Sequence, residues 1–166
     1  MNLYLLRHGV AVERGTRGYE NDDERPLTPK GRRKLRCAVK AMRAMDLSFD
    51  AILSSPLVRA RQTADMVGKG LHKKVTLTEH LAPGAKFATL IRYLRGLKPT
   101  PENALLVGHE PDLSELASLL MAGSADALAI TFKKGGLCKL SAEQLQAGKC
   151  ASLEWLLAPS QMELMA

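Results

Sequence analysis

The sequence is poor in aromatic residues, and this argues against nucleic acid as a partner. Phe, Trp and Tyr together make up only 4% of the 166 residues. Proteins that hold single-stranded nucleic acid stack the bases on aromatic side chains. None of the aromatic residues lies among the basic residues between 30 and 43. We therefore expect no nucleic-acid partner, although the net charge is +7.

Cysteine and histidine are also scarce, and their spacing is uneven. The sequence has three cysteines and none of them forms a CxxC pair: Cys37, Cys138 and Cys150. The four histidines lack the close spacing of metal ligands. An odd, scattered set of cysteines is typical of a reduced protein of the cytoplasm. We expect no disulfide, no metal site and no cofactor.

Long apolar runs are absent. No stretch approaches the roughly 18 apolar residues that a membrane span needs. Residues 1–8 are too short and too abruptly basic for a signal peptide. The apolar content of 46% is enough for a sizeable core. We therefore expect one domain over residues 1–166, in the cytoplasm and without a membrane partner.

The positive charge is concentrated in the first half of the chain. Residues 1–83 contain 16 of the 24 Lys and Arg but only 9 of the 17 acids, so the whole surplus lies there. A helix expected over 29–45 carries seven of these basic residues on the face opposite its apolar stripe: Lys30, Arg32, Arg33, Lys34, Arg36, Lys40 and Arg43. Such a face is either simply solvated or a docking surface for an acidic protein.

Short apolar segments alternate with stripes of helical period along the chain. Strands are expected at 2–6, 49–54, 75–78, 104–107, 128–132, 136–140 and 152–157. A helix is expected at 29–45, because Thr28 can cap it and Pro29 suits its first position. Another begins at Ser55-Pro56 by the same logic, runs to about 67 and ends near Gly68 and Gly70. Two more are expected at 87–97 and at 113–121. This alternation predicts an α/β fold, a three-layer sandwich with a mainly parallel central sheet and helices on both faces. The apolar tail at 160–166 either docks on the domain, forms an interface or frays.

Polar residues directly follow three of the expected strands, in the segments 7–9, 54–59 and 108–111. In an open parallel sheet, ligands bind beyond the carboxyl ends of the strands. If these three strands are parallel neighbours, His8, Arg59 and His109 converge at one edge of the sheet.

These residue types point to phosphoryl transfer. The imidazole of His8 is a competent nucleophile. The guanidinium of Arg59 fits phosphate oxygens, and it lies in the first turn of an expected helix, where free N–H groups also favour an anion. Gly9 is expected to let the backbone approach the phosphate closely. Together with His109, these groups can stabilise a transferring phosphoryl group without a metal.

Four motifs carry a resemblance to a known family: LYLLRHG at 3–9, RPLTPKG at 25–31, ILSSPLVRARQTA at 52–64 and LLVGHEP at 105–111. They resemble the histidine phosphatase superfamily, whose fold is phosphoglycerate-mutase-like. The short chain and the 25–31 motif resemble its SixA-type phosphohistidine phosphatases. The resemblance implies that His8 is the nucleophile and becomes phosphohistidine. It also implies a phosphate pocket of Arg7, Arg59 and His109, with Arg25 beside it.

The proton donor is less clear than the nucleophile. Many members of the superfamily place an acidic residue between the second and third motifs, where this chain has Glu79 and His80. The general acid is therefore Glu79, His80, His109 or none. A phosphorylated imidazole is a better leaving group than an alkoxide, so a weak or absent acid favours phosphohistidine as substrate.

The chain also lacks a long insertion that would form a cap subdomain over the site, so we expect an open pocket that admits a protein. The expected substrate is phosphohistidine on a protein such as a histidine phosphotransfer domain, with inorganic phosphate as product. Two alternatives remain: a phosphatase of small phosphomonoesters, and a non-catalytic module that binds phosphorylated partners.

Overall fold

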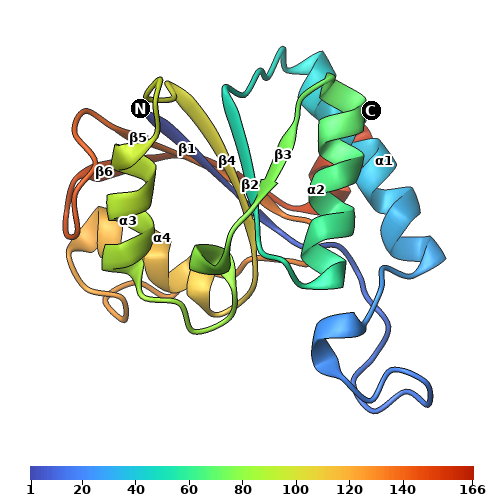
Figure 1. The fold of residues 1–166 in the computed structure, drawn as a ribbon. Coiled ribbons are helices and arrows are strands. Elements are labelled where there is room, and N and C mark those ends of the chain that lie inside the picture. The colour runs from blue at the N-terminus through green and yellow to red at the C-terminus, as the bar shows by residue number, and fades with distance from the viewer.

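A mixed sheet of six strands forms the centre of the molecule in the computed structural model, which describes residues 1–166 (Figure 1). The strands are β1 (Asn2–Arg7), β2 (Ala51–Ser54), β3 (Val75–Leu77), β4 (Asn103–Gly108), β5 (Leu137–Ala142) and β6 (Ala151–Leu157). Their order across the sheet is β3-β2-β4-β1-β5-β6. The first four run parallel to one another, and β5 runs antiparallel to both of its neighbours. The mainly parallel sheet is confirmed.

Helices cover both faces of this sheet. They are α1 (Pro29–Ala44), α2 (Val58–Leu71), α3 (Phe87–Gly96), α4 (Asp112–Ala122) and α5 (Pro159–Leu164), with 3₁₀ turns η1 (Asp22–Glu24) and η2 (Glu79–Leu81). Figure 1 shows α1 and α2 on one face and α3 and α4 on the other, which confirms the three layers. No cap subdomain stands over the sheet. None of the helices combines the length and the apolar character that crossing a membrane requires.

The central strand β1 is buried on both faces. Leu3 and Leu5 pack into the core beneath α3 and α4, whereas Tyr4 and Leu6 pack into the core beneath α1 and α2. Each of the four is at most 5% exposed. Successive side chains of a strand point to opposite faces, so this alternation requires a helical layer on each side. The carboxyl end of β1 is therefore held firmly from both sides.

Helix α1 begins where the sequence predicts. The Thr28 hydroxyl accepts a hydrogen bond from the Gly31 amide at 3.0 Å, and Pro29 occupies the first helical position. A side chain at Gly31 would collide with the backbone carbonyl of Val10. The glycine thus lets the loop that follows β1 pack against the first turn of α1.

Helix α2 differs from the expectation at both ends. It begins at Val58 rather than at 55–56, although the Ser55 hydroxyl accepts a hydrogen bond from the Leu57 amide at 3.3 Å and also lies 2.8 Å from His109 Nε2. It also continues past residue 67 to Leu71. Gly70 does not end the helix, because its missing side chain makes room for Val39 of α1, with which a Cβ would collide. The two helices pack closely at this point.

The strand expected at 128–132 is wrong. This segment has no regular secondary structure, although Phe132 is buried at 2% exposure. The Phe132 carbonyl accepts a hydrogen bond from Arg7 Nη1 at 2.6 Å instead of pairing with a strand. Both edges of β1 are already occupied by β4 and β5, so the segment has no partner there. The strands expected at 136–140 and 152–157 are confirmed as β5 and β6.

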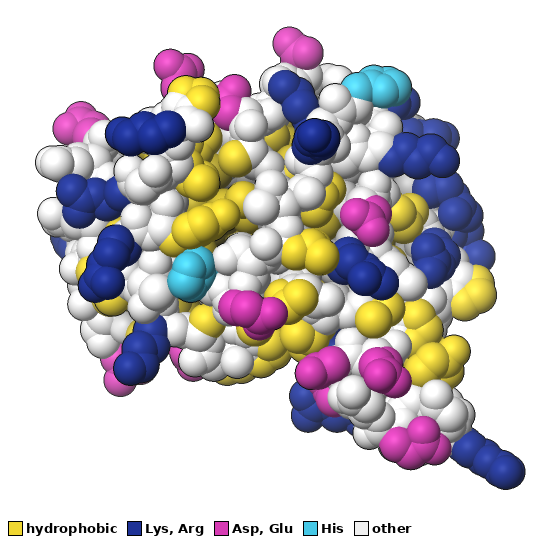
Figure 2. Space-filling model, in the orientation of Figure 1, with side chains coloured by type: hydrophobic (Ala, Val, Ile, Leu, Met, Phe, Trp, Pro, Cys, Tyr) yellow, Lys and Arg dark blue, Asp and Glu magenta, His cyan; other side chains and the backbone are white.

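Most of the basic side chains of α1 lie on its solvent-facing side. Five of its seven basic side chains are exposed: Lys30, Arg33, Arg36, Lys40 and Arg43. Lys34 forms an ion pair with Glu163 at 3.8 Å. Figure 2 shows Lys and Arg gathered along the side of the molecule that α1 and α2 form, with acidic side chains over the neighbouring loop between β1 and α1.

The tail docks on the domain. Met162 of α5 is fully buried in the core beneath α1, whereas Leu164 and Met165 beyond it are 89% and 41% exposed. Helix α5 lies against α1. Of the three possibilities that the sequence left open, the structure shows docking through one methionine.

We expect Met162→Ala to lower the free energy of unfolding by about 2–4 kcal/mol, because it leaves a cavity in a close-packed core. The matched control is Met165→Ala, for which we expect a change below about 0.5 kcal/mol. Urea denaturation followed by circular dichroism measures both. Equal effects of the two substitutions would show that α5 contributes nothing to the core.

Candidate active site

Parallel pairing brings the three polar segments together. Arg7 at the end of β1 lies opposite Gly108 of β4, and the neighbouring β2 follows in the same register. The His8 amide then donates to the Gly108 carbonyl at 3.1 Å. At this edge of the sheet lies a cavity of about 300 Å³. Its lining includes five of the residues singled out in the sequence: Arg7, His8, Arg25, Arg59 and His109.

His8 is buried and presents one nitrogen to the cavity. Its Nδ1 lies 2.7 Å from the Gly9 carbonyl oxygen. A carbonyl only accepts, so Nδ1 carries the proton and Nε2 keeps a lone pair. Burial lowers the pKa of His8 to about 3, and the positive charges of His109, Arg59 and Arg7 act in the same direction. The ring is therefore neutral at pH 7 and carries on Nε2 the lone pair that a nucleophile needs, which here accepts a hydrogen bond from Arg59 Nε.

His109 faces His8 across the cavity, with 5.2 Å between the ring centroids. Its Nε2 lies 2.8 Å from the Ser55 hydroxyl. Burial lowers the pKa of His109 to about 4, and Arg59 lowers it further, while Asp22 opposes them. The two histidines are thus both uncharged at neutral pH, within a cluster of arginines.

Two buried nitrogens of the site have no protein partner: His109 Nδ1 and Arg7 Nε. Buried polar groups are almost always hydrogen-bonded, so such a pair at one cavity marks a place for a ligand. The tautomer in which Ser55 donates to His109 Nε2 puts a proton on Nδ1. Both nitrogens are then donors, which is the arrangement that an oxyanion requires.

Arg59 is the second residue of α2, and its guanidinium is held in place on three sides. Its Nε lies 3.3 Å from His8 Nε2. Its Nη1 donates to the backbone carbonyl of Asp22 at 2.7 Å, and its Nη2 forms an ion pair with the Asp22 carboxylate at 3.0 Å. Arg25 also contacts this carboxylate, at 2.9 Å. Asp22 carried no signal in the sequence, because it is one of several acids in a polar loop.

Gly9 is held between α1 and α2, and the close approach of its backbone to a phosphate stays a prediction. Its amide donates to the Thr63 hydroxyl of α2 at 3.1 Å and is not free to bind phosphate. A Cβ on Gly9 would lie 2.7 Å from Leu35 Cδ1. A larger residue here would therefore have to displace the Leu35 side chain of α1.

Neither Glu79 nor His80 lines the cavity. Glu79 is exposed on η2, and the ring of His80 packs on Tyr93 with 4.9 Å between centroids. Two carboxyl groups do line the cavity, those of Glu13 and Glu110, and Glu110 directly follows His109 in the chain. Burial raises the pKa of Glu110, although hydrogen bonds from Ser114 oppose the shift. The sequence placed Glu110 next to a motif histidine but gave no reason to consider it as the acid.

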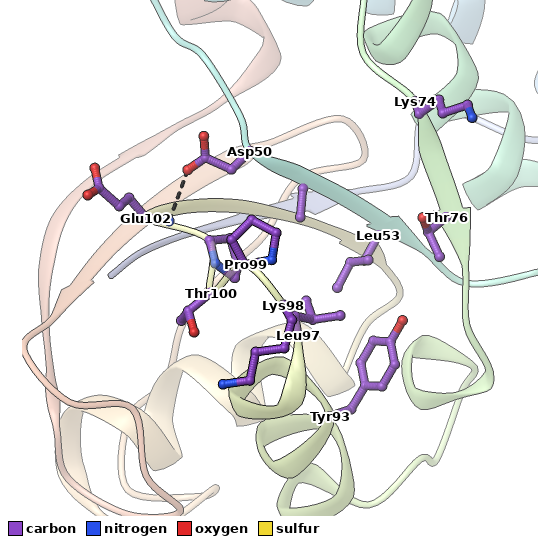
Figure 3. Close-up of a pocket in the computed structure, with 12 residues that line it drawn as sticks. Asp50, Leu53, Lys74, Thr76, Tyr93, Leu97, Lys98, Pro99, Thr100 and Glu102 are labelled. Carbon is purple, nitrogen blue, oxygen red and sulfur yellow. Dashed lines mark hydrogen bonds between the residues drawn. The ribbon is translucent and has the colours of Figure 1, made fainter.

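A second cavity, of about 480 Å³, lies at the opposite edge of the sheet, by the amino ends of β2 and β4 (Figure 3). It contains Lys74 and Lys98 but no histidine or arginine. The Asp50 carboxylate there already accepts hydrogen bonds from the amides of Glu102 and Asn103, each at 2.9 Å. Nothing in this cavity is arranged for attack on phosphorus.

No group of three or more His, Cys, Asp or Glu side chains in the chain is placed to hold a metal ion.

Comparisons with known proteins agree with this geometry. The model of the histidine phosphatase superfamily (branch 1) matches residues 3–82. An uncharacterized protein of Picosynechococcus sp. is 35% identical over 165 residues, which cover 96% of this chain and 97% of the relative. Phosphohistidine phosphatase SixA of Escherichia coli is 22% identical over 167 residues, which cover 99% and 98%.

The solved structure of the protein histidine phosphatase SixA complexed with tungstate superposes with a TM-score of 0.82 at 23% identity, over 96% of this chain and 98% of that chain. The chain belongs to the histidine phosphatase superfamily. Its fold matches that of SixA and is the phosphoglycerate-mutase-like arrangement that the motifs imply.

The low pKa of His8 predicts how the free energy of unfolding depends on pH. His8 stays neutral in the folded protein down to about pH 3, whereas an unfolded histidine takes up a proton near pH 6.5. The stability that neutral His8 contributes is therefore complete above pH 6.5 and falls as the pH drops toward 3. Between pH 7 and pH 5, the wild type should lose about 2 kcal/mol more unfolding free energy than His8→Asn.

Urea denaturation at the two pH values measures this difference. The exposed His72, which ends α2 at a φ of 55°, gives a control in His72→Asn, since asparagine tolerates this backbone conformation. Equal acid sensitivity of wild type and His8→Asn would contradict the assignment of His8 as a buried neutral base.

Proposed function

We propose that the protein is a phosphatase that works through a phosphorylated His8 and needs no metal. The observation that carries the proposal is the neutral His8 ring with its Nε2 lone pair, in a cavity lined by Arg7, Arg59 and His109. The nitrogens of Arg7 and His109 that lack a protein partner give the proposal further support, because buried polar groups are almost always hydrogen-bonded and both residues line this cavity.

The geometry supports two chemical steps. In the first, His8 Nε2 forms a bond to phosphorus as the bond from phosphorus to the leaving group breaks. The Nδ1–H bond to the Gly9 carbonyl stabilises the positive charge that develops on the ring. Arg7, Arg59 and His109 stabilise the charge on the phosphoryl oxygens. In the second, water forms a bond to phosphorus as the bond from phosphorus to His8 Nε2 breaks. A proton of that water passes to a phosphate oxygen, inorganic phosphate leaves, and the Nε2 lone pair is restored.

The substrate that fits best is phosphohistidine on a protein, such as a histidine phosphotransfer domain. No cap covers the cavity, so a folded partner can reach it. An imidazole leaves phosphorus with little help from an acid. The basic face of α1 supports an acidic protein partner, because complementary charge speeds the encounter of two proteins. The similarity to a protein named phosphohistidine phosphatase favours the same substrate class.

The three unpaired cysteines support a location in the reducing cytoplasm.

His8→Ala should abolish phosphate release and covalent phosphorylation, because it removes the nucleophile. We expect the wild type to release phosphate from a phosphohistidine-bearing phosphotransfer domain in the presence of a chelator. His72→Asn should retain wild-type rates, since this histidine lies outside the cavity. Circular dichroism shows whether each variant folds.

Turnover by folded His8→Ala would refute the phosphohistidine intermediate, and loss of wild-type activity in chelator would refute metal independence. If the wild type binds inorganic phosphate but releases none from any phosphorylated substrate, the protein is instead a binding module.

Glu110 favours a second candidate, hydrolysis of a small phosphomonoester. A carboxyl group with a raised pKa that lines the cavity can protonate an alkoxide leaving group, which an imidazole does not require. If the substrate is phosphohistidine, Glu110→Gln should change its hydrolysis by less than about tenfold, whereas loss of a general acid typically costs about 100-fold or more. Glu79→Gln removes the exposed carboxylate on η2 and serves as the comparison.

Initial rates on a phosphohistidine protein and on an alkyl phosphate measure the effect of both substitutions. A wild type that prefers the alkyl phosphate, together with a loss of about 100-fold in Glu110→Gln, would establish the second candidate in place of the first.

A further inference from the structure

We propose that Asp22 is a positioning residue of the phosphoryl site. Its carboxylate fixes the guanidinium groups of Arg59 and Arg25 so that their remaining N–H groups face the bound phosphoryl group. This inference rests on the proposed phosphatase function, since it assigns the residue that orders the cations of that site.

Three arginines converge on this one carboxylate. Oδ2 lies 3.0 Å from Arg59 Nη2, and Oδ1 lies 2.9 Å from Arg25 Nη2 and 2.8 Å from Arg14 Nε. The backbone carbonyl of Asp22 adds a hydrogen bond from Arg59 Nη1 at 2.7 Å. These arginines come from the loop after β1, from the segment before α1 and from α2, so Asp22 joins three parts of the chain.

The position of Asp22 relative to the cavity indicates how it acts. All three arginines line the cavity, but Asp22 does not. The side chains of Arg59 and Arg25 are 4% and 10% exposed, whereas that of Asp22 is 36% exposed. The carboxylate therefore contacts the guanidinium groups from outside the cavity. Arg25 Nη1 also donates to the Val12 carbonyl at 2.6 Å, so a ligand would take the Nη hydrogens of Arg59 and Arg25 that these bonds do not use.

The charges of the site also match a phosphoryl group once Asp22 is included. Five cationic side chains line the cavity, together with the two acids Glu13 and Glu110. With Asp22, and with Glu13 and Glu110 ionised, the surplus is two positive charges, which balances the two negative charges of a phosphate dianion. Burial raises the pKa of Asp22, but Arg59, Arg14 and Arg25 lower it by more, so the carboxylate is ionised at neutral pH.

Replacing Asp22 by asparagine separates positioning from bulk electrostatics, because the two effects have opposite signs. Removal of one negative charge raises the positive surplus to three, which by itself would strengthen the binding of an anion. Loss of the contacts lets Arg59 and Arg25 move, which weakens binding and slows the reaction. Displacement of a catalytic group by about 1 Å can cost about 100-fold in rate.

The experiment compares Asp22→Asn with Asp23→Asn. Asp23 is the next residue of η1, is exposed and forms no ion pair with an arginine, so its variant makes the same change in charge. We measure kcat and KM on p-nitrophenyl phosphate, inhibition by orthovanadate, and binding of inorganic phosphate by calorimetry. Thermal unfolding of each variant reports on the fold.

We expect Asp22→Asn to lower kcat/KM by about 10-fold to 100-fold and to weaken orthovanadate more than phosphate. A merely structural role would not change the ratio of these two affinities, because orthovanadate resembles the transition state and phosphate the product. Asp23→Asn should stay within about twofold of the wild type. Unchanged or tighter binding in a folded Asp22→Asn would overturn the proposal and identify Asp22 as a competing anion.

Asp22→Glu keeps the charge but moves the carboxylate, and it decides the case if Asp22→Asn fails to fold. Positioning predicts a loss of kcat/KM in Asp22→Glu, whereas wild-type values would overturn the proposal. If the wild type binds phosphate but has no phosphatase activity, weaker phosphate binding by Asp22→Asn still supports the positioning role. In that outcome only the proposed function fails.

Discussion

The structure depends on the parallel pairing of β1 with β4 and of β4 with β2. This pairing sets Arg7 opposite Gly108 and Ser54 opposite Val107, so the chain leaves all three strands at the same edge. A shift of register by one residue would turn every side chain of a strand to the other face and expose the core. The apolar alternation that buries the sheet therefore also brings His8 and His109 together.

Burial is what gives these histidines their chemical character. Four arginines line the cavity, yet both imidazoles remain neutral. Burial destabilises the protonated imidazolium, because it removes the charge from water, and the nearby guanidinium groups repel it. A site that concentrates positive charge for an anion thus also keeps its nucleophile unprotonated. Asp22 limits the repulsion among the cations without occupying the space of the ligand.

Much of the fold could be predicted from the sequence, because its signals are local. Strand-length apolar runs, the Thr28 cap and the helical stripes define most of the elements, and the order of polar segments after strands predicts that His8 and His109 meet. The errors arose where tertiary packing overrides a local signal. Gly70 makes room for a neighbouring helix and does not end its own, and the segment that contains Phe132 resembles a strand but finds no free edge beside β1.

The finer contacts of the site could not be predicted, because they join residues that are far apart in the chain. The carboxylate of Asp22 has the same local signature as the other acids of its loop, and only the fold brings Arg59 to it. The same holds for Ser55, which resembled a helix cap, accepts a hydrogen bond from the Leu57 amide, and also contacts His109. Glu79 and His80 had the expected place in the sequence, but η2 directs the His80 ring toward Tyr93.

The place of His8 directly after the most central part of the sheet has a consequence for how the site opens. The His8 amide is bonded to β4, and β1 is buried on both faces, so hydrogen exchange at His8 requires an opening close to global unfolding. The loop over 13–24 is largely exposed and is attached mainly through the arginine contacts of Asp22, so its amides exchange through small local openings. The site thus combines a nucleophile that directly follows the buried central strand with arginines that contact a carboxylate on an exposed loop.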